Sequence, residues 1–270
     1  MTTDNIVFQS FSSGSCGNCY FLHTEGIDGG AGILIDAGVS MRRLKAELLR
    51  SGFTFDNIDG ILITHDHMDH IHNLGPYCKR LFKPVWMTGK LRRSLATHWM
   101  TGPYLTGVVH QLGKSGEWTE IVPGNIMVKY FEVPHDATQT VGYCIDLKGY
   151  IFTIMTDIGR ITDEAIEYAS KSSTVVIEAN YDLEMLRGGT YPVELQDRIC
   201  GGHGHLSNAE CADAIREFMH PGLKNIFLCH LSEHNNTPQK ALETCTPALG
   251  REKVRLTALP RESASPLFIL

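Results

Sequence analysis

The chain has 270 residues, of which 43% are apolar, enough to bury one sizeable hydrophobic core. Its formal net charge of −6 excludes a generally basic protein that coats DNA through many phosphate contacts. No segment reaches about 18 consecutive apolar residues, and residues 1–10 lack the apolar stretch of a signal peptide. We therefore expect one domain over residues 1–270, in the cytoplasm and without membrane contact, with its eight cysteines reduced.

The N-terminal part begins with short apolar or alternating segments joined by Gly-rich turns. These segments predict the strands of an antiparallel meander, over residues 6–11, 19–23 and 32–36. The turn over residues 12–18 contains backbone N–H groups that could bind an anion. Ser15 and Asn18 in this turn are candidate phosphate contacts, although a plain hairpin loop explains the same residues. Apolar residues at helical spacing then predict a helix over residues 41–52.

The most informative motif follows the apolar residues 61–63. Residues 64–70 read Thr-His-Asp-His-Met-Asp-His and contain an H-x-H-x-D-H pattern, whose metal-capable side chains are His65, His67, Asp69 and His70. Imidazole and carboxylate are good ligands for borderline divalent cations, and alternate spacing after a strand lets two pairs point at two adjacent ions. The motif therefore predicts a dinuclear metal site.

Three further ligands are expected where later strands end, because loops at strand ends gather around functional sites. The candidates are His135 after residues 127–133 and Pro134, Asp157 after residues 150–156, and His230 after residues 225–229. Seven ligands result. We predict that one ion is held by His65, His67 and His135, and the other by Asp69, His70 and His230. Asp157 would bridge the two ions.

Capping residues mark the later helices. They are Thr162 before a helix that continues to Ala169, Ser207 with Glu210 in a capping box, and Thr237 with Pro238 at the start of a last helix. Strands at both ends of the chain with helices between them predict an α/β fold, a four-layer αββα sandwich of two mixed sheets. Only 72 residues separate Asp157 from His230. We therefore expect no cap domain between them.

The order of the seven ligands resembles that of the metallo-β-lactamase fold superfamily. Five stretches further resemble its YycJ/WalJ-like branch, described as DNA exonucleases: residues 14–20, 34–38, 178–182, 204–208 and 230–236. The resemblance extends from about Ser10 to beyond Asn236, and Cys16 stands where the branch usually has Ser. It implies a 5′ to 3′ exonuclease that acts on DNA and uses zinc or manganese.

The predicted site suits hydrolysis of a phosphodiester. Two ions about 3.5 to 4 Å apart can hold a hydroxide between them as nucleophile and polarise a substrate oxygen, and no G-x-S-x-G motif supplies another nucleophile. Besides the ligand Asp69, the candidate catalytic residues are His205 and His234, as proton donors or phosphate contacts. The resemblance adds Asn180 and Ser207 as possible substrate contacts, although Ser207 also fits a plain helix cap.

Two aspartates and three clusters of basic residues lie outside the predicted ligand set. Asp36 and Asp136 are expected to hydrogen-bond ligand imidazoles or loop backbone. Basic residues cluster in residues 42–45, 79–83 and 90–93. The first cluster fits a solvated helix face, whereas the other two flank the metal motif and could carry a nucleic-acid strand.

The same ligands leave other functions open. Nitrogen and oxygen ligands admit zinc, manganese and iron alike. A small-molecule hydrolase acting on a cyclic phosphodiester or a thioester would use the same site, whereas a lactamase is disfavoured in a chain without a signal peptide. A di-iron redox protein would need a flavin-binding partner domain, for which the sequence after Asn236 is too short. A regulatory protein with a degenerate site would have lost ligands, and none is missing. No protein partner can be inferred.

Overall fold

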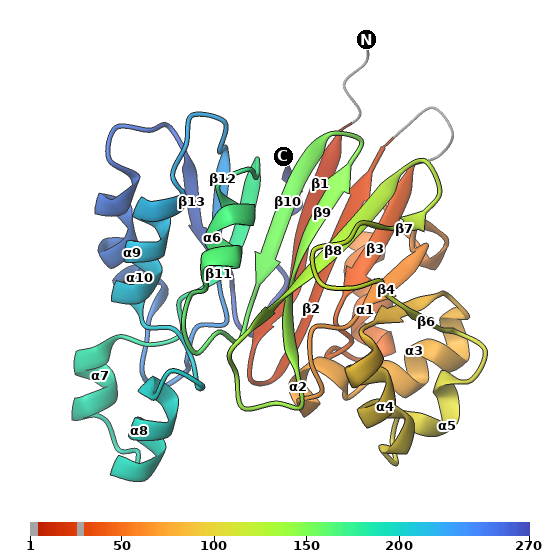
Figure 1. Cartoon of the computed structure of the whole chain (residues 1–270), viewed down its shortest axis with the longest axis horizontal. Coiled ribbons are helices and arrows are strands. Elements are labelled where there is room, and N and C mark those ends of the chain that lie inside the picture. The colour runs from red at the N-terminus through yellow and green to blue at the C-terminus, as the bar shows by residue number, and fades with distance from the viewer. Residues whose placement is uncertain (1–4, 26–29) are drawn as a thin grey trace.

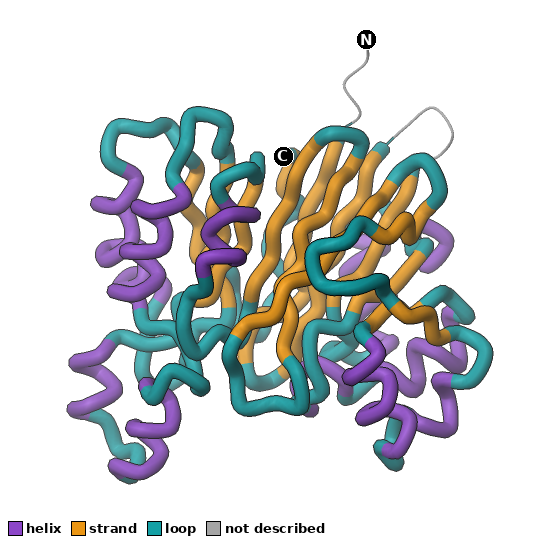
Figure 2. The backbone as a smooth tube through the Cα atoms, viewed as in Figure 1, coloured by secondary structure: helices purple, strands orange, loops and turns teal. Residues whose placement is uncertain are grey.

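The structure is a computed structural model that describes residues 5–25 and 30–270. The first four residues of the polar N-terminal stretch therefore lie outside the described residues. Two mixed seven-stranded sheets face each other, and helices cover the outer side of each sheet (Figures 1 and 2). The predicted α/β fold with two sheets and helices is confirmed.

The first sheet contains the N-terminal meander. Its strand order is β14 (Phe268–Ile269), β1 (Ile6–Gly14), β2 (Gly17–Thr24), β3 (Ala31–Ile35), β4 (Gly60–Leu62), β5 (Val85–Met87) and β6 (Val109–Gln111). Strands β1 to β3 pair antiparallel as predicted, and β3 to β6 pair parallel. Strands β1 and β2 extend further than predicted, because Ser13 pairs with Asn18 and Gly14 with Gly17. The predicted loop over residues 12–18 is therefore a turn of two residues, Ser15 and Cys16.

The second sheet repeats this arrangement of antiparallel and parallel strands. Its strand order is β13 (Arg255–Ala258), β12 (Asn225–Cys229), β11 (Thr174–Glu178), β10 (Tyr150–Met155), β9 (Thr140–Leu147), β8 (Ile126–Val133) and β7 (Thr119–Val122). Strands β7 to β10 pair antiparallel, and β10 to β13 pair parallel. The parallel strands end at one edge, where the loops that follow them meet.

The helices confirm the predicted caps. They are α1 (Met41–Arg50), α2 (Met68–Ile71), α3 (Leu74–Leu81), α4 (Gly89–Thr97), α5 (Gly102–Leu105), α6 (Asp163–Ala169), α7 (Leu183–Gly188), α8 (Val193–Cys200), α9 (Asn208–Phe218) and α10 (Pro238–Cys245), with 3₁₀ turns at η1 (Phe55–Asn57) and η2 (Thr246–Leu249). Thr162 and Thr237 cap α6 and α10, and Ser207 forms a capping box with Glu210 at α9. Helices α2 to α5, α7 and α8 were not predicted. Within the described residues, no helix has the length and apolar character needed to cross a membrane.

Three apolar clusters hold the layers together. One lies between the sheets, where the Phe8 ring is 5.3 Å from that of Phe152 and 4.9 Å from that of Phe227, centroid to centroid. The second packs the second sheet against α6, α9 and α10, and the third packs the first sheet against α1, α3 and α4. Because buried apolar area is the main favourable contribution to folding, these clusters hold the strand ends that carry the functional side chains in place.

Candidate metal centre

The seven predicted ligands come from the carboxyl ends of four strands. The motif over residues 64–70 follows β4, His135 follows β8, Asp157 follows β10 and His230 follows β12. Asp157 and His230 adopt left-handed backbone conformations, with φ of 57° and 54°, and so does Asp36 after β3, with φ of 63°. Asp and His tolerate this conformation better than most residues. The left-handed residues turn the chain abruptly where each strand ends.

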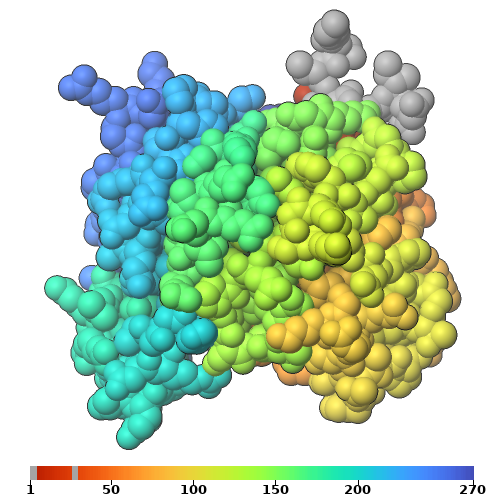
Figure 3. All heavy atoms as spheres, in the orientation of Figure 1, coloured from red at the N-terminus to blue at the C-terminus, as the bar shows by residue number. Residues whose placement is uncertain are grey.

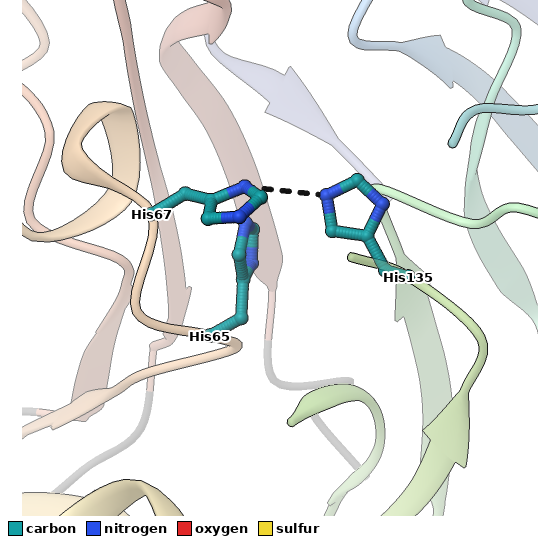
Figure 4. Close-up of side chains that lie close together, drawn as sticks. All are labelled: His65, His67 and His135. Carbon is teal, nitrogen blue, oxygen red and sulfur yellow. Dashed lines mark hydrogen bonds between the residues drawn. The ribbon is translucent and has the colours of Figure 1, made fainter. Parts of the chain in front are cut away.

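The first predicted ligand triad is compact. One nitrogen each of His65, His67 and His135 lies within 4.8 Å of the others. The three imidazoles point toward one another from two loops, and His67 Nδ1 is 3.3 Å from His135 Nε2 (Figure 4). These three side chains can therefore converge on one cation.

The second predicted triad is equally compact. One ligand atom each of Asp69, His70 and His230 lies within 4.8 Å of the others. Asp157 belongs to a separate group with His65 and His70 at the same spacing, so it contacts members of both triads. The structure thus brings together all seven residues in the grouping expected for two ions, although their role as ligands stays a prediction.

Three of the imidazoles are anchored through Nδ1, and their Nε2 atoms lie toward other predicted ligands. His70 Nδ1 donates to Asp36 Oδ2 at 2.7 Å, which confirms the expected contact of Asp36 with a ligand imidazole. His135 Nδ1 donates to a backbone carbonyl at 2.7 Å, and His230 Nδ1 donates to a carboxylate at 3.0 Å. The buried Nε2 atoms of His65 and His230 have no hydrogen-bond partner in the described part of the chain. Such unpartnered nitrogens are costly unless a cation binds them.

The charges of the centre also favour cations. Burial by itself raises the pKa of Asp69 and Asp157, but neighbouring imidazoles outweigh it and hold both pKa values well below the ordinary value. Burial lowers the pKa of His230, yet the neighbouring carboxylates of Asp157, Asp69 and Glu178 raise it to about 10. Burial likewise opposes the charge of His70, but three carboxylates raise its pKa well above the ordinary value. Divalent cations could replace the protons that balance these buried carboxylates.

Asp136 lies near the first triad without hydrogen-bonding to it. Its Oδ1 is 3.6 Å from His67 Nε2 and 3.5 Å from His135 Nε2, both longer than hydrogen bonds. Its Oδ2 accepts a hydrogen bond from Arg198 Nε at 2.6 Å. Within the described residues Asp136 forms no hydrogen bond with a ligand imidazole, because its carboxylate is paired with Arg198 of α8. Its role in orienting a ligand stays a prediction.

Glu178 is a functional candidate to which the sequence analysis assigned no role. It ends β11, is fully buried, and its Oε1 accepts hydrogen bonds from His205 Nδ1 at 2.8 Å and His230 Nδ1 at 3.0 Å. Its Oε2 accepts from the backbone N–H groups of Ile158 and Leu206 at 2.7 and 3.2 Å. A carboxylate at the carboxyl end of a buried parallel strand, where Asp157 also lies, was the sequence signal that could have identified it.

Replacing Glu178 by Gln should weaken metal binding about 10- to 100-fold, as changes in residues that orient metal ligands do. The amide nitrogen of the Gln side chain would face one of the N–H groups from which the carboxylate now accepts hydrogen bonds. His230 would then lose its fixed orientation. Competition with a chromogenic chelator measures the affinity. Glu184→Gln on α7 is the control, because Glu184 is exposed and its side chain forms no hydrogen bond within the described residues. Unchanged affinity in Glu178→Gln would contradict this role.

A pocket of about 320 Å³ opens beside the predicted ligands. Of the predicted catalytic and substrate-contacting residues, those that line it are Ser15, Asn180, His205 and His234. Helix α8 lines the pocket through Leu195, Arg198 and Ile199, and Tyr191, two residues before the helix, lines it too. His67, His135 and His230 also contribute to the lining, so a molecule in the pocket would contact the ligand region directly.

Asn18 and Ser207 do not line this pocket. Asn18 is fully buried, and its amide nitrogen lies 3.0 Å from Asp69 Oδ2 and 3.1 Å from the Gly14 carbonyl oxygen, both as donor. The Ser207 hydroxyl donates to Glu210 Oε2 at 2.6 Å within the capping box. These positions indicate that Asn18 holds Asp69 in place and that Ser207 is a structural helix cap.

Comparisons with known proteins agree with this geometry. Residues 32–230 match the family model described as beta-lactamase superfamily domain, a span that includes all seven predicted ligands. Exodeoxyribonuclease WalJ of Streptococcus pneumoniae is 30% identical over 253 residues, covering 93% of this chain and 91% of that protein. Exodeoxyribonuclease YycJ of Bacillus anthracis is 30% identical over 234 residues, covering 87% and 85%. The solved structure of unliganded yeast PDE1 covers 99% of this chain and is itself covered completely (100%), with a TM-score of 0.73 and 14% identity, a likeness in fold alone.

Proposed function

The chain belongs to the beta-lactamase superfamily, in its YycJ/WalJ-like branch, and is a metal-dependent hydrolase; from this premise we propose that it is an exodeoxyribonuclease with two metal ions that degrades DNA from 5′ to 3′. One observation carries the proposal. Seven metal-capable side chains converge beside an open pocket in a chain that is 30% identical to named exodeoxyribonucleases over most of its length. We further propose that it acts as a single domain without a cap domain.

The residues of the centre fit two divalent cations. We assign one cation to His65, His67 and His135, the other to Asp69, His70 and His230, and the bridging position to Asp157. The two buried imidazole nitrogens that have no partner among the described residues support this assignment. Such ions, when bound, supply an activated water and polarise a phosphoryl oxygen. An all-nitrogen and oxygen ligand set suits zinc or manganese, and iron fits it as well.

His205 is the best-placed proton donor for the leaving oxygen. Its Nδ1 donates to Glu178, so Nε2 is the nitrogen left for the pocket that the ring lines. A proton delivered from Nε2 would complete cleavage of a phosphodiester. His234 lines the same pocket, with its ring 5.9 Å from that of Tyr191, and is the second candidate for this role or for a phosphate contact.

The pocket suits the end of a strand. Its volume of about 320 Å³ is at the small end of the range for ligand sites, so it suits a unit of nucleotide size rather than a duplex. Leu195 and Ile199 lie one turn apart on α8 and line the pocket together with Tyr191, which precedes the helix. A terminal base could pack against this apolar side while Ser15 and Asn180 offer polar groups from other sides.

DNA labelled separately at its 5′ or its 3′ end tests the function. With Mn²⁺ we expect the 5′ label to appear first in mononucleotides, and the 3′ label to remain in shortening fragments. His67→Ala is the control, because it removes a predicted ligand and should abolish both products. Intact DNA with the wild type, or identical degradation with His67→Ala, would overturn the proposal.

The small pocket also favours a second candidate, a hydrolase of a cyclic phosphodiester that uses the same centre. Hydrolysis of a cyclic dinucleotide or a cyclic mononucleotide by the wild type, with labelled DNA left intact under the same conditions, would replace the first candidate by the second.

A further inference from the structure

A long segment next to the metal motif contains no acidic residue. Residues 70–116, named here the basic segment, contain seven Lys and Arg and no Asp or Glu: Lys79, Arg80, Lys83, Lys90, Arg92, Arg93 and Lys114. Because the whole chain carries −6, removing this +7 leaves −13 for the remaining residues. We propose that the basic segment binds the single strand of nucleic acid that leaves the pocket beyond the bond to be cut. The identity of this strand rests on the proposed function.

The cations of the basic segment are available to a partner. Six are exposed and Lys83 is half-buried. In the part of the chain that the structure describes, none of the seven forms an ion pair with a carboxylate, whereas Arg187, Arg198 and Arg216 elsewhere do. Unpaired positive charge that is concentrated on one part of an acidic protein attracts a polyanion to that part.

Helix α4 of the basic segment is tied to the metal loops. Its Ser94 hydroxyl donates to Asp66 Oδ2 at 2.7 Å, and Asp66 Oδ1 accepts from the Thr138 N–H at 3.1 Å. Asp66 lies between two predicted ligands in the motif, and Thr138 follows a third by three residues. Lys90 is one helical turn before Ser94 and therefore lies on the same side of α4. A strand that leaves the centre on this side would meet Lys90 early.

Helix α3 continues the basic segment away from the centre. It begins three residues after α2, and Asn73 between them donates to the Gly38 carbonyl at 3.0 Å. At about 1.5 Å per residue, Lys79 and Arg80 lie roughly 8 Å along the axis from the start of α3. Helices α3, α4 and α5 form one side of the lower part of the molecule, and α7 and α8 form the other side (Figures 1 and 3). The pocket contacts α8, so the basic segment lies on the opposite side of the centre.

Exposed aromatic rings accompany these cations. Trp99 is 79% exposed, Phe82 is 75% exposed and Tyr104 is 41% exposed, all within the basic segment. Cationic side chains with aromatic rings between them bind single strands, because the rings stack on bases while the cations contact phosphates. A duplex keeps its bases stacked inside and would leave these rings unused. The combination favours a single strand over a duplex.

Fluorescence anisotropy with a labelled single-stranded oligonucleotide tests the inference, in EDTA so that no cleavage occurs. The variant Lys90→Gln/Arg92→Gln/Arg93→Gln should bind at least about tenfold more weakly than the wild type. The slope of log K against log salt should be smaller in magnitude by about two in this variant, because each of the three lost phosphate contacts to a single strand contributes about 0.7. Trp99→Ala should weaken binding by about tenfold through lost stacking.

The matched control is Arg251→Gln/Lys253→Gln/Arg255→Gln, which removes three exposed cations near β13. It should bind like the wild type. Equal affinity and salt dependence in both triple variants would overturn the inference, and so would tighter binding of a blunt duplex with no effect of Trp99→Ala. If the protein fails to degrade DNA with Mn²⁺ while the Lys90 triple variant and Trp99→Ala lose binding and the Arg251 triple variant does not, the proposed function falls and the inference stands. If it degrades DNA while all variants bind alike, the inference falls and the function stands.

Discussion

Asp157→Asn should lower hydrolysis of end-labelled DNA in the presence of Mn²⁺ by about a thousandfold or more. The Asp157 carboxylate lies within 4.8 Å of His65 and His70 and is the predicted bridge between the two ions. An amide carries no charge and binds hard cations poorly, so the variant should lose a metal-ion contribution of several kcal/mol, and each 1.4 kcal/mol corresponds to a factor of ten in rate. Initial rates under saturating Mn²⁺ measure the loss.

Asp182→Asn is the matched control for the same chemical change. Asp182 caps α7 by accepting a hydrogen bond from the Met185 N–H at 2.9 Å, and Asn caps helices as well as Asp does. Its activity should equal that of the wild type. Wild-type activity in Asp157→Asn would contradict the assignment of the bridge.

Removal of the metal should stop hydrolysis and lower the Tm by about 10 °C. A ligand that binds only the folded state, at about a thousand times its Kd, stabilises that state by about 4 kcal/mol, and each kcal/mol shifts the Tm of a chain of this size by about 2 to 4 °C. The half-buried carboxylate of Asp69 and the buried one of Asp157 then have only imidazole protons to balance their charge. Thermal unfolding in EDTA and in excess Mn²⁺ or Zn²⁺ measures the shift.

The same comparison in His67→Ala supplies the control. With a predicted ligand missing, this variant should show a much smaller shift between EDTA and excess metal. An identical Tm of the wild-type protein in both conditions, with hydrolysis continuing in EDTA, would exclude a metal centre as the source of activity.

The meeting of the predicted ligands could be foreseen from the sequence because each follows a buried strand. His135, Asp157 and His230 are far apart in the chain, but strand ends in packed sheets share one edge. A polar residue that ends an apolar run is therefore informative about position without knowledge of the partner. The same local patterns explain why the caps at Thr162, Ser207 and Thr237 were predicted correctly.

Contacts that depend on pairing between distant segments could not be foreseen. The contact of Asn18 with Asp69 joins residues 51 apart and depends on how β1 and β2 extend into the turn. Glu178 likewise contacts His205 and His230 from a different strand end, so no spacing rule indicates its partners. The pairing of Asp136 with Arg198 requires α8, a helix without a cap hydrogen bond from a side chain.

The most direct test of the dinuclear centre is the metal content of the purified protein, measured by plasma mass spectrometry after dialysis against Mn²⁺ or Zn²⁺ and removal of free ions. We expect two divalent ions per wild-type chain, and well below one in His67→Ala/His230→Ala, which lacks one ligand from each triad. Equal metal content in the two proteins, or a wild-type chain without bound metal, would contradict the account.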